Sequence, residues 1–402
     1  DGSGWNTSTS MLLDALFANY AEGQNLLSLH GLYYSTLGGW WEWAPPGNHF
    51  HEPYWAEMPA LLGMMERLSY LLSQGYHCAD VAIIYPVESV VAGDGGKSVR
   101  CAFQLGEQLY SQWIDFDFID YGSLAKASVK DKALHVSGEN YSVLVIPSMK
   151  TIQSATLQKA LDFQRAGGIV LSVDDRADQT ELGAMDEKRK AASNELQHCA
   201  SNEVLDYITH HINLDFNTEA VKPYIMHRRI GFRDLYAVYH VAKGTTCYFR
   251  TKGSVELWDP WTGNTRPLSA VQTDDKGTFI NMPLDSTEMQ LIVFDPSKEA
   301  EIAATRSEVK RDLLTLDGEW NTQVLPVLDN RWGDFSWPAT PDSMMPEIRS
   351  LRYSETKEKG WNRRDFDDSK WQTSRLSYGN HFLLSGPLAR PLDESKLLGG
   401  AI

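Results

Sequence analysis

Residues 29–55, LHGLYYSTLGGWWEWAPPGNHFHEPYW, bring eight aromatic rings and three histidines together among glycine and proline pairs. Such pairs are typical of a loop, so these rings do not belong to an ordinary core element. The faces of tryptophan and tyrosine stack on the C–H faces of sugars, while neighbouring polar side chains bind the hydroxyls. The segment therefore predicts a saccharide-binding loop. Its candidate contacts are His30, Tyr33, Tyr34, Trp40, Trp41, Glu42, His49 and His51.

Carboxylates are the second requirement for chemistry on a sugar. Hydrolysis of a glycosidic bond usually takes two of them, roughly 5 to 9.5 Å apart. The loop offers only Glu42 and Glu52. Glu42, between two tryptophans, is a weak candidate for a catalytic acid or base, because burial would raise its pKa. Glu52 is followed by Pro53 and could equally be a charge at the N-terminus of the next helix. The catalytic carboxylates therefore stay unassigned within this segment.

Two other interpretations of these residues stay open. Some rings could simply fill the mouth of a barrel. The three loop histidines could bind a metal, but a His-x-His pair without a third ligand of known spacing gives zinc little support.

A second motif, VLDNRWGDFSWP at 327–338, sets three oxygen-bearing side chains close together. Asp329, Asn330 and Asp334 are weak candidates for calcium ligands, because calcium prefers carboxylate and amide oxygens. The alternative is a turn stabilised by Asx side chains, with its tryptophans packed on a β core.

The elements around the loop indicate how it is held. Periodic apolar residues predict helices over 7–22 and 56–73, and the apolar run 25–31 predicts a strand buried on both sides. Helix, strand, loop and helix form one α/β unit of a (β/α)8 barrel, which typically needs about 250 residues. Because barrel sites lie at the carboxyl ends of the strands, the loop would open onto the catalytic face.

Two further sequence patterns follow along the chain. Strand patterns at 80–86, 115–120, 141–147 and 169–173 alternate with helix patterns at 100–113 and 153–166, which predicts a parallel, doubly wound sheet. The polar stretch 183–203 reads as a solvated helix or loop. After Thr218, short β-rich runs separated by turns predict an antiparallel sandwich.

These patterns predict a multidomain α/β plus β chain with four parts. They are the C-terminal end of a (β/α)8 barrel at 1–77, a flavodoxin-like α/β domain at 78–217, a β-sandwich at 218–297, and a linker with a partial sugar-binding-like (galactose-binding-like) β module at 298–402. The flavodoxin-like part matches neither an FMN phosphate loop nor a P-loop, so no organic cofactor is expected.

Composition excludes several classes of partner. Acidic residues outnumber basic ones 53 to 37, and the net charge of −16 disfavours nucleic acid. No apolar run approaches the roughly 20 residues that span a bilayer, so no membrane partner is expected. The four cysteines lie far apart without a CxxC pair and are expected to be free or buried thiols.

Three stretches resemble one known family. The family is that of large α-L-rhamnosidase-like glycoside hydrolases. The end of their catalytic barrel is similar to LHGLYYSTLGGWWEWAPP and the following PYW. Their downstream modules are similar to VELWDPWTG and LDNRWGDF. The resemblance implies an inverting hydrolase of plant-type polysaccharide that depends on calcium. An extracytoplasmic (periplasmic or secreted) location is also expected. It places the catalytic glutamates on earlier barrel strands, upstream of Asp1, so the chain alone is expected to be inactive. It also implies that His30, Tyr34, Trp41 and Glu42 line the pocket.

Two alternatives stay open beside this hypothesis. One is a non-catalytic carbohydrate-binding or scaffold protein whose sandwiches bind the sugar. The other is a β-galactosidase-like hydrolase, which also combines a barrel with a flavodoxin-like domain.

Overall fold

The computed structural model describes residues 7–29, 48, 50, 52, 54–220, 222–303, 349–353, 360, 363, 365–367 and 369–376. The chain divides into two compact units. The larger comprises Phe17–Leu26 and Met64–Glu308, and the smaller comprises Asp1–Leu16, Leu27–Gly63 and Val309–Ile402. Parallel and antiparallel sheets occur together with helices, which gives the chain the multidomain α/β plus β class that the sequence predicts.

The two helices predicted around the aromatic loop are confirmed. They are α1 (Thr9–Ala21) and α2 (Met58–Ser73), the second preceded by the short 3₁₀ helix η2 (Trp55–Glu57). In the larger unit, Tyr20 of α1 is fully buried, and its hydroxyl lies 2.7 Å from Ser69 Oγ and donates to the Met65 carbonyl at 3.1 Å. These bonds fix the end of α1 to the middle of α2.

The strand predicted over 25–31 is wrong where the structure describes it. Residues 25–29 form no strand and are exposed or half-buried, and Leu26 is 81 % exposed. A strand needs a neighbour for its backbone hydrogen bonds, and no described strand pairs with this segment. Apolar composition alone therefore misled the prediction.

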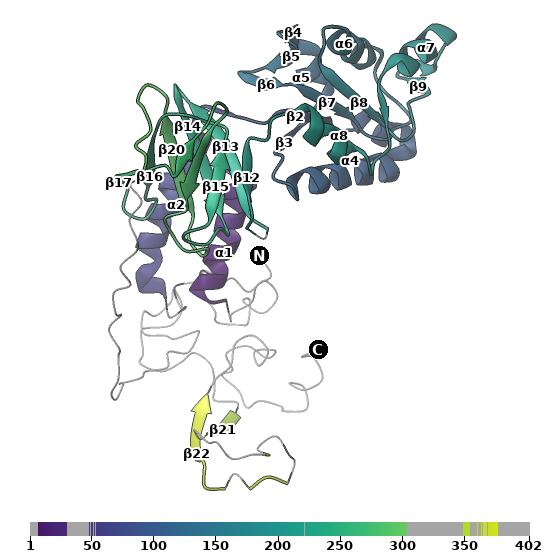
Figure 1. Ribbon diagram of the computed structural model, residues 1–402. Helices are drawn as coiled ribbons and strands as arrows, with labels where there is room; N and C mark the ends of the chain where they lie inside the picture. The colour runs from purple at the N-terminus through teal and green to yellow at the C-terminus, as the bar shows by residue number, and fades with distance from the viewer. Residues whose placement is uncertain are drawn as a thin grey trace. The chain divides into compact units, whose positions relative to one another are not determined.

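A five-stranded parallel sheet lies in the larger unit, as predicted (Figure 1). Its strands, in spatial order, are β11 (His198–Cys199), β8 (Ile169–Val173), β7 (Val143–Ile146), β2 (Val81–Ile84) and β3 (Phe116–Ile119). If these five strands are numbered 1 to 5 by their order along the chain, the sheet reads 2-1-3-4-5 from its β3 edge. The central strands are buried on both faces, which explains their continuous apolar runs.

Helices cover both faces of this sheet. Residues of α4 (Gly95–Tyr110) and α8 (Val204–His211) pack on one face, and residues of α5 (Tyr121–Lys126) and α6 (Ser154–Arg165) pack on the other. The helix predicted at 100–113 is confirmed with shifted limits. The stretch 183–203 contains the largely exposed α7 (Glu187–Glu195), as expected for a solvated segment.

Several short elements complete this region and were not predicted. They are α3 (Val87–Ser89), the π-turn η3 (Val90–Asp94), an antiparallel sheet of β4 (Ser128–Lys130), β5 (Ala133–Val136) and β6 (Glu139–Tyr141), and the pair β9 (Gln179–Thr180) and β10 (Gly183–Ala184).

The predicted antiparallel β-rich region forms two sheets. The six-stranded one has the order β1 (Tyr76–His77), β13 (Tyr224–Ile230), β14 (Arg233–Tyr239), β20 (Gln290–Asp295), β16 (Ser254–Trp258) and β17 (Thr265–Leu268). The four-stranded one has the order β12 (Phe216–Thr218), β15 (Thr246–Phe249), β19 (Thr278–Asn281) and β18 (Gln272–Thr273).

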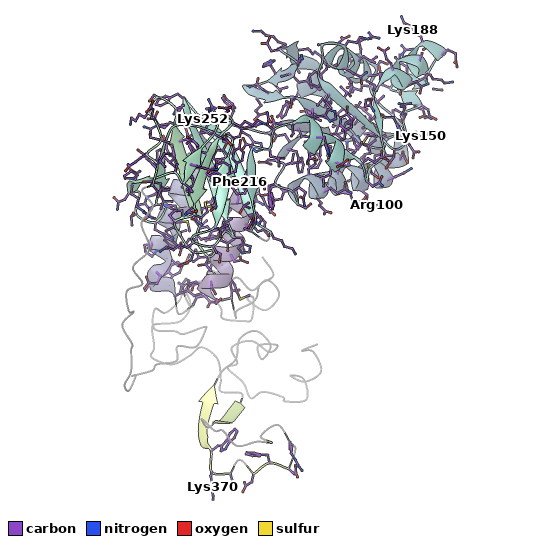
Figure 2. All side chains as sticks on the ribbon, viewed as in Figure 1. Arg100, Lys150, Lys188, Phe216, Lys252 and Lys370 are labelled. Carbon is purple, nitrogen blue, oxygen red and sulfur yellow. The ribbon has the colours of Figure 1, made fainter. Side chains whose placement is uncertain are left out.

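Aromatic side chains fill the space between these two sheets. Phe216 and Phe249 of the smaller sheet meet Tyr236 and Phe294 of the larger one, with ring centroids 4.9 to 5.7 Å apart. Phe216 lies inside this core, whereas Lys252 lies at the surface (Figure 2). The other face of the larger sheet packs on α1, where Phe17 and Tyr239 form an edge-on ring pair at 5.5 Å.

In the smaller unit, β21 (Arg349–Tyr353) pairs antiparallel with β22 (Gln372–Leu376), in the region predicted to be a second β module. All four cysteines are free, which confirms the prediction from their spacing. Among the described helices, none combines the length and the apolar character needed to cross a bilayer.

Candidate active site

The predicted sugar-binding residues all lie outside the described part of the chain. They are His30, Tyr33, Tyr34, Trp40, Trp41, Glu42, His49 and His51. The candidate calcium ligands Asp329, Asn330 and Asp334 lie outside it as well. From residues 29–55, the structure describes Leu29, Asn48, Phe50, Glu52, Tyr54 and Trp55. These show how the segment enters α2.

A tight turn carries the end of the segment into η2. The Glu52 carbonyl accepts a hydrogen bond from the Trp55 amide at 3.0 Å, and the Tyr54 carbonyl accepts one from the Glu57 amide at 2.9 Å. The ring of Phe50 meets that of Trp55 edge-on, with centroids 6.2 Å apart. Backbone bonds and a ring contact thus fix the position of Glu52 immediately before the helix.

The Glu52 side chain is buried without a partner. The residue is 2 % exposed, and neither carboxyl oxygen has a hydrogen-bond partner in the structure described here. The sequence left open that Glu52 is a charge at a helix N-terminus. A capping carboxylate accepts bonds from the first amides of the helix, and Glu52 accepts none. The structure therefore gives no support to a capping role.

Burial changes the protonation of this carboxyl group. Desolvation raises the pKa of Glu52 from 4.5 to about 8, because removal from water disfavours the charged form. The Tyr54 hydroxyl is also buried without a described partner, and burial followed by the charge of Glu52 raises its pKa. Near neutral pH, Glu52 therefore holds a proton. It can donate a hydrogen bond through that proton and accept one at its carbonyl oxygen.

Glu52 is a candidate site residue that the sequence analysis did not select. Its signal is local: an acidic residue stands among aromatic and apolar neighbours in HFHEPYW, where a surface charge is unusual. An unpaired buried carboxyl costs free energy. Buried carboxyl groups with strongly shifted pKa values cluster at functional sites, which makes Glu52 a candidate site residue.

The described residues offer no alternative built on a metal. Within them, no group of three or more histidine, cysteine, aspartate or glutamate side chains is arranged to hold an ion.

A family model decides the identity of the chain. The model described as Glyco_hydro_106, alpha-L-rhamnosidase, matches residues 41–272. The match covers more than half of the 402 residues and includes Glu52 and the turn before α2. The chain belongs to this family. The resemblance to α-L-rhamnosidase-like glycoside hydrolases that the sequence motifs carry is thereby confirmed.

One solved rhamnosidase structure agrees with the family at the level of the fold. A rhamnosidase from Novosphingobium sp. PP1Y matches with a TM-score of 0.55 and 21 % identity over 80 % of this chain and 32 % of that one. This chain therefore spans about a third of the length of that rhamnosidase. A β-galactosidase from Bacillus circulans sp. alkalophilus matches with a TM-score of 0.44 and 14 % identity over 61 % of this chain and 46 % of that one. No curated protein matches the chain.

Proposed function

We propose that this rhamnosidase-family chain is part of a longer glycoside hydrolase that cleaves α-L-rhamnosides in plant-type polysaccharide. The observation that carries the proposal is the family model described as alpha-L-rhamnosidase, whose match spans Glu52 and its buried, partnerless carboxyl. A sugar presents many hydroxyl and ring oxygens, and these supply the hydrogen-bond partners that Glu52 lacks.

In this proposal Glu52 binds substrate as a protonated acid. Its proton donates a hydrogen bond to a sugar oxygen, and the neighbouring Tyr54 hydroxyl offers a second polar contact. The loop residues named above, from His30 to His51, stack on the sugar and bind its hydroxyls. The pair of carboxylates that glycoside hydrolysis requires is proposed to lie on earlier strands of the barrel, in a part of the enzyme outside this chain.

The domain plan is proposed on the same basis. Residues 1–77 would close the barrel, 78–217 form a flavodoxin-like domain, 218–297 a sandwich, and 298–402 a linker with a partial galactose-binding-like module. The strand order 2-1-3-4-5 supports the second assignment, because flavodoxin-like sheets have this order. An extracytoplasmic location is proposed from the polysaccharide substrate.

The test uses the longer enzyme and an aryl α-L-rhamnoside. Glu52→Ala should raise KM at least tenfold, about 1.4 kcal/mol, because the sugar loses a buried partner. Glu52→Gln should keep most of the activity at pH 6, because an amide resembles a protonated carboxyl in shape and charge. The exposed Glu57, five residues along the chain, provides the matched control Glu57→Ala, which should change neither constant.

The pH profile separates this role from a purely structural one. In the unchanged enzyme, kcat/KM should fall as the pH rises through about 8, where Glu52 loses its proton. Glu52→Gln should lack this fall. A fall that persists in the variant would assign it to another group and remove Glu52 from the site. Turnover of aryl β-galactosides with no turnover of aryl α-L-rhamnosides would replace the proposed substrate, and no turnover of either would favour a binding protein.

Calcium is proposed from the sequence motif alone, with Asp329, Asn330 and Asp334 as ligands. Calorimetric titration of the 402-residue chain with calcium checks it. The unchanged chain should show heat of calcium binding, and the double variant Asp329→Asn/Asp334→Asn should show none.

A further inference from the structure

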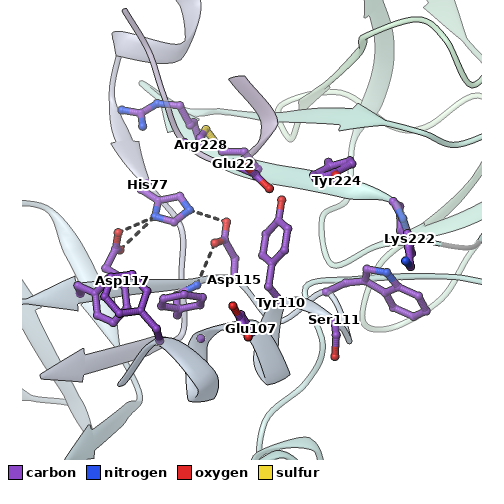
Figure 3. Close-up of a pocket in the computed structure, with 18 of the residues that line it drawn as sticks. Glu22, His77, Glu107, Tyr110, Ser111, Asp115, Asp117, Lys222, Tyr224 and Arg228 are labelled. Atoms are coloured by element: carbon purple, nitrogen blue, oxygen red, sulfur yellow. Dashed lines mark hydrogen bonds and ion pairs between the residues drawn. The ribbon is translucent and has the colours of Figure 1, made fainter. Parts of the chain in front are cut away.

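A cleft of about 960 Å³ lies within the larger unit (Figure 3). Its walls come from the C-terminal half of α4, the edge strand β3, the start of β13 and the residues that follow α1. The volume falls at the upper end of the range of roughly 300 to 1,000 Å³ that ligand pockets occupy. All lining residues belong to the larger unit, whereas residues 29–55 belong to the smaller one.

Three phenylalanines form an apolar platform in one wall. Phe118 of β3 meets Phe116 and Phe103, with ring centroids 5.3 Å apart in both pairs. Phe103 is 49 % exposed and Phe118 is 38 % exposed, although α4 and β3, which carry them, pack in the core of the parallel sheet. Contiguous exposed rings next to a cleft are typical of a binding surface, because folding alone would favour their burial.

A tryptophan is held in the cleft by an unusual backbone. Trp113 has φ 60°, the left-handed region that favours glycine, directly after α4. The Ile114 amide closes the helix end by donating to the Leu109 carbonyl at 3.1 Å. A bulky residue costs about 1 kcal/mol or more in this conformation. The indole lines the cleft and also packs against the sandwich core, and a smaller side chain would serve the turn better.

Acidic, basic and hydroxyl side chains surround these rings. Glu22, Tyr110 and Tyr224 face the same space, and Glu107, Ser111 and Lys222 lie around it (Figure 3). The Tyr110 ring is fixed in place, because its hydroxyl accepts from the Ile225 amide at 3.2 Å. The cleft thus offers anionic acceptors, a cationic donor and neutral hydroxyls.

An ion-paired histidine balances the charge at one end of the cleft. His77 Nε2 lies 2.6 Å from Asp115 Oδ2, and Nδ1 lies 3.0 Å from Asp117 Oδ2 (Figure 3). Burial lowers the pKa of His77, but the two carboxylates outweigh it and hold the pKa well above its usual value. The imidazolium therefore stays charged and neutralises much of this acidic end. A strongly anionic ligand would still meet the carboxylates of Glu22, Glu107 and Glu139.

We propose that this cleft binds a neutral oligosaccharide, as a site additional to the aromatic loop. Phenyl and indole faces stack on the apolar faces of successive sugars, while the carboxylates, the hydroxyls and Lys222 bind their hydroxyl groups. The choice of a saccharide rests on the proposed function, because a polysaccharide-degrading enzyme gains from holding a second stretch of its polymer. Nucleotides and other phosphate ligands fit poorly, because acidic side chains outnumber basic ones in the lining.

The test is calorimetric titration of the 402-residue chain with a neutral rhamnose-containing tetrasaccharide, and in parallel with xylotetraose and cellotetraose. At least one should bind. Phe118→Ala and Glu107→Gln should each weaken that binding at least tenfold, because the first removes a stacking face and the second a charged acceptor. Phe232 is 57 % exposed and outside the lining, so Phe232→Ala is the matched control and should bind like the unchanged chain. Thermal melting checks that each variant is folded.

Several outcomes would overturn the proposal. Titration up to about 10 mM tetrasaccharide detects even millimolar affinity. If no tetrasaccharide binds at that concentration, the cleft is not a saccharide site. If Phe118→Ala and Glu107→Gln bind the sugar as tightly as the unchanged chain, the binding site lies outside the cleft. Failure here is separable from failure of the proposed function, because the longer enzyme carrying Phe118→Ala should still hydrolyse an aryl α-L-rhamnoside at the unchanged rate.

Discussion

His227 Nε2 lies 2.9 Å from Asp234 Oδ1 inside the sandwich, where Asp234 is 1 % exposed. On its other side, His227 Nδ1 lies 2.9 Å from Asp215 Oδ2. Arg250 extends this chain of charges, because its guanidinium contacts Asp215 at 3.2 Å and Asp80 at 2.8 Å. Asp80 directly precedes β2, so the network joins the sandwich to the parallel sheet within the larger unit.

Removing the histidine should leave the buried carboxylates of Asp215 and Asp234 without the cation between them, with only Arg250 and Arg229 beside them. We expect His227→Ala to lower the free energy of unfolding by about 3 to 5 kcal/mol, the usual effect of breaking a buried ion pair. Urea denaturation of the 402-residue chain, followed by circular dichroism, measures it. The exposed pair of His210 and Asp206 gives the control, since His210→Ala should cost less than about 1 kcal/mol. Equal effects of the two substitutions would show that the buried network stabilises nothing.

The same network should make stability depend on pH. Burial lowers the pKa of His227, but Asp215 and Asp234 outweigh it and raise the pKa well above 6.5. A histidine whose pKa is raised on folding binds more protons when folded. Its stabilisation is therefore complete below pH 6.5 and is lost as the pH rises through the folded-state pKa.

Unfolding free energies measured from pH 6 to 10 check this expectation. Stability should decline on the alkaline side, and the decline should be smaller in His227→Gln, which has no proton to lose. His77 contributes in the same direction, because its pKa is also raised. The double variant His77→Gln/His227→Gln should therefore show the flattest profile. An unchanged decline in the double variant would assign the effect to other groups.

Glu52 should impose a separate pH dependence. Its pKa is about 8 in the folded chain and near 4.5 when solvated, so the folded state holds the extra proton between these values. Its contribution to stability is complete below pH 4.5 and is lost as the pH rises through about 8, at about 1.4 kcal/mol per pKa unit. Glu52→Gln should consequently be more stable than the unchanged chain at pH 9, and the difference should shrink toward pH 5. A variant less stable at pH 9 would mean that Glu52 has an ionic partner.

The sequence predicted elements well where local pattern and final environment agree. Strands such as β2 and β7 are continuous apolar runs because helices cover both of their faces. Residues 25–29 carry a similar run and form no strand, because strand formation depends on partners that a local pattern does not include. For Glu52 a helix-start charge was one of two open interpretations, and its burial became evident only in the folded chain. The cleft could not be predicted at all, since α4, β3 and β13 meet only after folding.

Gly75 joins α2 to β1 at a position where a side chain has no room. Its φ is +63°, and an added Cβ would lie 1.9 Å from the Arg229 carbonyl oxygen. Gly231 provides a matched control, because its φ is +61° and an added Cβ would meet nothing within 4 Å. Gly231→Ala should cost about 1 to 2 kcal/mol from the left-handed backbone alone. Gly75→Ala carries the same penalty and also forces β13 away from the chain entering β1, so its cost should exceed about 3 kcal/mol. Urea denaturation of both variants measures the difference, and equal costs would show that β13 moves aside freely and that β1 adds little to the sheet.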